Sequence, residues 1–135
     1  MSEEEIRTVR GRCLCGGVVF EATDRIRNVI YCHCKQCRAW HGNYIGYSGC
    51  AEKNLHFVSD RTLKWYASSD DAKRGFCTDC GSSLFWKENQ SEGICFTAGC
   101  LDEPTGITSE SHIYVGSAGD SYELTDGLPK YEESD

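Results

Sequence analysis

The stretch YCHCKQC, residues 31–37, carries three cysteines within six positions and a histidine between two of them. Clustered thiols of this kind are typical of a disulfide framework, of a closed structural metal site, or of a metal site with one position left for a substrate. Three cysteines alone cannot complete a tetrahedral zinc site. Other parts of the sequence are therefore needed to decide among these three kinds of site.

The cysteine content of the chain is high, with ten cysteines in 135 residues. A chain of this length predicts one domain, 1–135. Its N-terminal segment MSEEEIRTVR has no apolar stretch of the kind found in secretory signals, and no apolar run approaches the ~18 residues of a membrane helix. We therefore expect a cytoplasmic protein with no membrane partner and with reduced, metal-binding thiols, in preference to a secreted disulfide scaffold.

The formal net charge of −7 is concentrated at the two ends of the chain. Residues 6–130 contain all 14 basic residues and 15 of the 21 acidic ones, so they are nearly neutral. No basic stripe is present, which argues against nucleic acid as a partner. We expect the acidic ends, 1–5 and 132–135, to be frayed and solvated.

Short runs rich in β-branched and aromatic residues dominate the chain, and turn residues separate them. Turns are expected at 15–17, 69–75, 88–93 and 102–106. Helical periodicity is weak, with one or two turns expected in KQCRAWHG after Cys34. The prediction is a mainly β fold of small antiparallel sheets with metal-binding loops. The predicted strands are GVVFEA, NVIYC, NYIGYS, NLHFVS, TLKWYA, SSLFWKE, ICFTAG and HIYVG.

Four cysteines form two closely spaced pairs with 61 residues between the pairs. These are Cys13 with Cys15 and Cys77 with Cys80. The Cys-x-x-Cys spacing of the second pair lets the chain curl so that both sulfurs reach one ion, and Gly16 and Gly17 permit a bend after the first pair. Four thiolates make a closed, structural zinc site. The alternative is a set of buried reduced cysteines without metal.

The opening stretch supplies a second set, Cys32, Cys34 and Cys37. Three protein ligands and a vacant position are typical of a catalytic zinc. His33, His41 and Cys100 are the alternatives for a fourth ligand, and Cys100 would close the site. A zinc ion held by three thiolates is better suited to binding an incoming thiol than to activating water. The expected substrate is therefore a thiol or a thiol adduct, which points toward glutathione-like molecules.

Five blocks of the sequence, in order, resemble the family of glutathione-dependent formaldehyde-activating enzymes and centromere protein V. They extend from Gly11 to Glu133, nearly the whole chain. The blocks are GRCLCGGVVFEA, YCHCKQCRAWHG, RGFCTDCGSSLFW, AGCLDEP and SHIYVGSAGDSYELTDGLPKYEE.

The resemblance implies a β-tent fold, two zinc ions per chain and carbon–sulfur lyase activity on S-hydroxymethylglutathione or a similar adduct. It assigns the four-cysteine set to the structural zinc and Cys32, Cys34 and Cys37 to the catalytic zinc. Cys100 departs from the family, which more often has a small polar residue there. That difference raises the prospect of a fourth thiolate or a redox-sensitive site.

Two further residues lie in these blocks and are candidates for proton transfer, Asp102 and His112. The alternative for Asp102 is a turn cap, and for His112 a hydrogen bond to the backbone at a strand end. The alternative to a lyase is a non-catalytic zinc-binding scaffold that binds a protein partner. A nucleic-acid-binding zinc ribbon is disfavoured by the charge.

Overall fold

The computed structural model describes residues 5–134 and confirms a mainly β fold with one short helix, α1 (Lys35–His41). The expected helical turn after Cys34 is therefore confirmed. Among the described residues, no helix is long and apolar enough to traverse a lipid bilayer. The strands are β1 (Glu5–Arg12), β2 (Val18–Ile26), β3 (Val29–Cys32), β4 (Ile45–Ala51), β5 (Leu55–Asp60), β6 (Leu63–Ala67), β7 (Ala72–Cys77), β8 (Ser83–Glu88), β9 (Gly93–Thr97) and β10 (Ser109–Ile113). Three 3₁₀ turns accompany them, at Glu52–Asn54, Ala98–Cys100 and Val115–Ser117.

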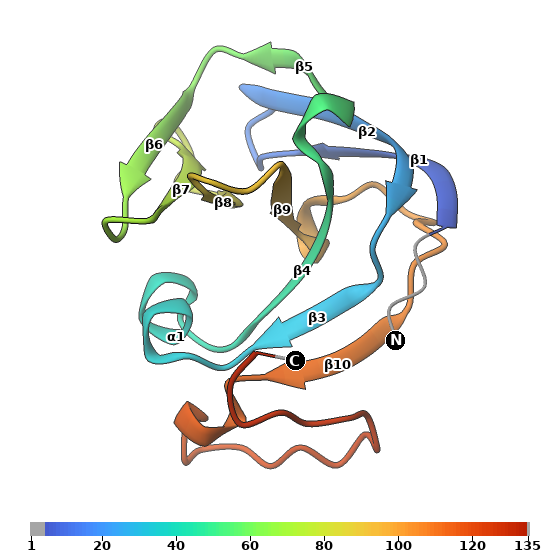
Figure 1. Ribbon diagram of the computed structural model, residues 1–135. Helices are drawn as coiled ribbons and strands as arrows, with labels where there is room; N and C mark the ends of the chain where they lie inside the picture. Colours follow the sequence, from blue (N-terminus) through green and yellow to red (C-terminus); the bar gives the residue numbers. More distant parts are fainter. Residues whose placement is uncertain (1–4, 135) are drawn as a thin grey trace.

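The strands form two sheets that lean on each other, which confirms the β-tent expected from the sequence (Figure 1). One sheet has the order β1-β2-β5, and the other has the order β10-β3-β4-β9-β8-β7-β6. All pairs are antiparallel except β10 with β3, which are parallel. The sheets are thus mainly antiparallel, as expected, and the one parallel pair arises because β10 reaches β3 by a long connection rather than by a hairpin.

The core lies between the two sheets and is centred on three buried phenylalanines. Phe20 of β2 has its ring 5.0 Å from that of Phe85 of β8 and 5.4 Å from that of Phe96 of β9. All three side chains are fully buried, and buried residues alternate with more exposed ones along most of β2, as in a half-buried strand. Burial of these large apolar rings is the main force that holds one sheet against the other.

The turn expected at 69–75 is shorter than the sequence indicated. Ala72 and Arg74 are buried and pair with β8, so they belong to β7, and the turn is confined to the residues before Ala72. Because Lys73 and Arg74 are polar, residue type alone did not indicate a strand in this segment. Strand propensity depends on burial and on neighbouring strands more than on residue type, which explains the error.

The segment after β10 folds back along that strand and is held by backbone hydrogen bonds (Figure 1). Tyr114 N donates to Glu133 O, and Gly116 N donates to Glu132 O. At the other end Glu5 pairs with Ile26 as the first residue of β1. Glu5, Glu132 and Glu133 thus have backbone partners. The expectation of frayed ends stays a prediction, and residues 1–4 and 135 lie outside the described residues.

Candidate functional site: two cysteine clusters

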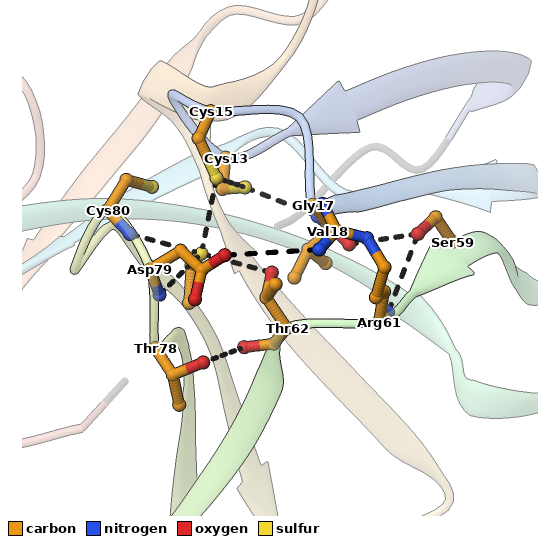
Figure 2. Close-up of polar contacts among 11 residues, drawn as sticks. Cys13, Cys15, Gly17, Val18, Ser59, Arg61, Thr62, Thr78, Asp79 and Cys80 are labelled. Carbon is orange, nitrogen blue, oxygen red and sulfur yellow. Dashed lines mark hydrogen bonds and ion pairs between the residues drawn. The ribbon is translucent and has the colours of Figure 1, made fainter.

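The four cysteines expected to bind one zinc ion lie together, although they come from distant parts of the chain. Cys13 and Cys15 occupy the turn between β1 and β2, and Cys80 lies in the turn between β7 and β8 (Figure 2). Cys77 is the last residue of β7. Their four sulfurs lie within 4.8 Å of one another. The Sγ atoms of Cys13 and Cys15 are 3.7 Å apart, and those of Cys15 and Cys77 are 3.6 Å apart.

These distances fit a zinc ion. Four sulfurs placed about 2.3 Å from a tetrahedral zinc lie about 3.8 Å from one another. Backbone N–H groups also point at the sulfurs: Val18 N donates to Cys13 Sγ at 3.2 Å, and Cys80 N donates to Cys77 Sγ at 3.4 Å. Such donors stabilise the thiolate form that a metal requires. The cluster can therefore bind a metal, and its ligand set leaves no open position.

Glycines shape the turns that carry these ligands. Gly16 and Gly81 have φ angles of +83° and +78°, a conformation that side chains with a Cβ rarely adopt. Gly17 lies so close to Thr62 that a Cβ would fall 2.2 Å from the threonine Oγ1. That hydroxyl in turn lies 3.1 Å from Cys77 Sγ (Figure 2). The bend expected at Gly16 and Gly17 is thus confirmed, and it is fixed by contact with the opposite ligand turn.

The second cluster lies where β3 ends and α1 begins. Cys32 is the last residue of β3, Cys34 is the N-cap of α1, and Cys37 lies in its first turn. The three sulfurs lie within 4.8 Å of one another. Cys34 Sγ accepts a hydrogen bond from Cys37 N at 3.3 Å, so the helix N-terminus holds the ligand turn in place.

Hydrogen bonds among the three sulfurs shift the pKa values of Cys32 and Cys34 in opposite directions. Hydrogen bonds from the thiols of Cys32 and Cys37 lower the pKa of Cys34 to about 2. The same contacts raise the pKa of Cys32 well above its ordinary value, because its thiol donates to an already ionised neighbour. These contacts favour the thiolate form at Cys34, the form that a metal ion requires of its cysteine ligands.

No fourth ligand joins this cluster from the His, Cys, Asp and Glu side chains of residues 5–134. His41 is held away by a 2.8 Å hydrogen bond between its Nε2 and the hydroxyl of Tyr47. Cys100, the residue that would have closed the site, donates its thiol to Thr97 O instead, and burial raises its pKa to about 11. The cluster therefore offers three protein sulfurs.

His33, the third alternative ligand, belongs to a buried chain of hydrogen bonds. Its Nδ1 lies 2.7 Å from the hydroxyl of Tyr122, and its Nε2 lies 2.8 Å from His112 Nδ1. His112 Nε2 lies 2.8 Å from Asp126 Oδ2, and this contact lowers the pKa of Asp126. Burial lowers the pKa of His33 to about 4, so its ring is neutral at pH 7. Both ring nitrogens of His33 and both of His112 thus have hydrogen-bond partners. Proton transfer by His112 stays a prediction.

Sequence reasoning missed Tyr122 and Asp126, which complete this chain of hydrogen bonds. They lie in the C-terminal segment, far from His33 in sequence, and no short-range spacing links them to it. The only signal is that both fall within the last of the motif blocks, SHIYVGSAGDSYELTDGLPKYEE.

A cleft of about 650 Å³ lies beside the four-cysteine cluster, whose Cys13 is part of its lining, and no ligand of the three-cysteine cluster lines it. Its lining includes Leu14 beside the four-cysteine cluster, Trp40 of α1, and Asp102. Asp102 is largely exposed and forms a 3.2 Å ion pair with Arg12. Such surface pairs contribute little stability. The structure thus places Asp102 on the wall of a cleft of ligand size and leaves its role in proton transfer a prediction.

None of the ten cysteines is in a disulfide. Cys50 is buried and Cys95 is partly buried, and neither belongs to a cluster. We expect protein that has been denatured in the presence of a chelator, without reductant, to titrate close to ten thiols. The measurement is reaction with a chromogenic disulfide, with a reduced and denatured sample as the control. A count near zero would contradict the reduced, metal-bound state.

Comparison with known proteins identifies relatives across most of the chain. The family model for the glutathione-dependent formaldehyde-activating enzyme matches residues 8–117. An uncharacterized lyase of Schizosaccharomyces pombe is 27% identical over 115 residues, which cover 84% of this chain and 83% of that one. The crystal structure of a Rhodobacter sphaeroides protein is similar with a TM-score of 0.59 at 18% identity, covering 90% of this chain and 98% of that one. At this identity the structural match shows the fold alone.

Proposed function

The chain belongs to the glutathione-dependent formaldehyde-activating enzyme family, and from this premise we propose that it is a zinc-dependent carbon–sulfur lyase. Its substrate is the adduct of a glutathione-type thiol with an aldehyde, such as S-hydroxymethylglutathione, and it acts in a reducing compartment such as the cytoplasm. The four-cysteine cluster holds a structural zinc ion. Cys32, Cys34 and Cys37 hold a second, catalytic one.

The observation that carries this proposal is the three-sulfur cluster without a fourth ligand among residues 5–134. A zinc ion held by these three thiolates would supply a fourth position in which an incoming thiol could bind as its thiolate. Cys37 is buried at 4% exposure, whereas Cys32 and Cys34 are partly exposed. One side of the cluster is therefore accessible to solvent, and the other side packs against the protein interior.

The reaction requires no change of oxidation state. In the synthetic direction the thiol sulfur bonds to the aldehyde carbon, the carbonyl π bond breaks, and the oxygen takes up the proton that the thiol has lost. In the lyase direction the carbon–sulfur bond breaks, its electron pair returns to sulfur, and the hydroxyl proton leaves as the carbonyl reforms. Asp102, on the cleft wall, is the proposed partner for that proton, and His112 would act through His33.

Cobalt substitution tests whether the fourth position is open. Cobalt-loaded protein is expected to change its visible absorption when millimolar glutathione is added, because a new sulfur ligand enters the coordination sphere. S-methylglutathione is the matched control. It has the same peptide but no thiol, and it should leave the spectrum unchanged.

Cobalt in the four-cysteine cluster contributes a constant background, because that cluster is already complete. A spectrum that stays constant across the whole thiol titration would contradict the lyase. It would favour the alternative, a non-catalytic scaffold that binds a protein partner.

A further inference from the structure

Arg74 of β7 is one of the most deeply buried side chains of the protein, at 2% exposure. An arginine remains charged inside a protein, and a buried charge without a partner of opposite sign is strongly destabilising. Arg74 nevertheless takes part in none of the ion pairs found within residues 5–134. Its positive charge must be compensated in another way.

The guanidinium group of Arg74 is directed at the three-cysteine cluster. Its Nε and Nη2 donate to Gln36 Oε1 at 3.2 and 2.8 Å, and its Nη1 donates to the hydroxyl of Tyr47 at 3.3 Å. Its Nη2 also lies 3.5 Å from Cys37 Sγ. The amide and the phenol are neutral groups. The sulfur of Cys37 is the partner that becomes an anion when the cluster binds metal.

We propose that Arg74 is the counter-cation of the three-cysteine centre and favours anionic over neutral ligands at its fourth position. This inference rests on the proposed function, since it takes the cluster to hold a divalent metal with an open position. Three thiolates around a divalent ion leave one net negative charge, and a substrate thiolate makes that two. Arg74 offsets one of them at short range in a water-poor environment, where charge interactions are strong.

The strand that carries Arg74 explains how the charge is held in place. Cys77, three residues further along β7, belongs to the four-cysteine cluster. Gln36 lies between Cys34 and Cys37 on α1, so its two hydrogen bonds with Arg74 tie the ligand turn to β7. The four-cysteine cluster therefore anchors the strand that carries Arg74, and Arg74 faces the three-cysteine cluster. Arg74 is a positioning residue for the substrate sulfur.

The test compares a thiol with a neutral ligand on cobalt-loaded protein. Glutathione adds a negative charge to the centre, whereas imidazole adds none. In Arg74→Met the dissociation constant for glutathione should rise about tenfold to a hundredfold, the range seen for outer-shell partners of metal ligands, while that for imidazole stays nearly constant. Arg74→Lys, which keeps the charge, should recover most of the affinity for glutathione.

Arg27→Met is the matched control for loss of an arginine. Arg27 lies 3.7 Å from the sulfur of Cys95, a cysteine outside both clusters, and it donates to the backbone oxygen of Tyr47 at 2.9 Å, away from the hydroxyl that Arg74 contacts. Its replacement should leave both dissociation constants unchanged. If Arg74→Met does not fold, Gln36→Leu replaces it, because Gln36 is exposed and its loss frees the guanidinium group. That variant should show the same selective loss of glutathione binding, to a smaller extent.

Each outcome supports or overturns the role of Arg74. Equal losses for both ligands, or no loss for either, would overturn the role of Arg74 and leave the proposed function standing. A wild-type centre that binds no thiol would overturn the proposed function, and the role of Arg74 with it.

Discussion

Cys80→Ser is expected to yield insoluble or unfolded protein. Its cluster joins the turn between β1 and β2 to the turn between β7 and β8, across 61 intervening residues. Structural zinc contributes about 10–16 kcal/mol of apparent binding free energy in small domains, which is comparable to their total stability of about 5–15 kcal/mol. Serine is a poor zinc ligand, so loss of this one sulfur removes most of that contribution. Solubility, circular dichroism and metal content measure the result.

Cys100→Ser is the matched control for this variant. Cys100 is also partly buried, but it lies outside both clusters, and its thiol donates a hydrogen bond to Thr97 O. Its replacement should leave a soluble, folded protein with two metal ions. If Cys80→Ser were equally soluble and melted at the wild-type temperature, the structural assignment of the four-cysteine cluster would be wrong.

Cys34→Ser is expected to remove the second metal ion and the activity while the protein melts only slightly lower. Cys32, Cys34 and Cys37 lie within one short segment, so a metal ion there closes very little chain and constrains little of the fold. Serine is also among the preferred residues at a helix N-cap, so α1 should keep its start at residue 34. Loss of the ligand is thereby separated from loss of the helix.

Metal analysis, thermal melting and the thiol-dependent cobalt spectrum together test this variant. One metal ion per chain, a nearly unchanged melt and no response to glutathione are the expected results. If Cys34→Ser unfolds while Cys80→Ser remains folded, the structural and catalytic assignments of the two clusters are reversed.

Local spacing along the chain accounts for most of what could be predicted about the metal ligands. Cys-x-x-Cys and Cys-x-Cys bring their sulfurs together through the geometry of one turn, and Gly16 supplies the left-handed conformation which that turn needs. The mainly β fold could also be predicted, because period-two alternation and turn residues are encoded within a few positions. The sequence by itself therefore determined the fold class, and it proposed the two ligand sets that the structure brings together.

Tertiary structure decided everything that depends on contacts between distant segments. Arg74 meets Cys37 across 37 positions, and His33 meets Tyr122 across 89, and no local pattern signals either pair. The same holds for the parallel pairing of β10 with β3 and for the position of Cys100, whose thiol lies at Thr97 rather than at the open cluster. Spacing brings ligands together within a turn, whereas burial and the packing of the two sheets determine which charges face them.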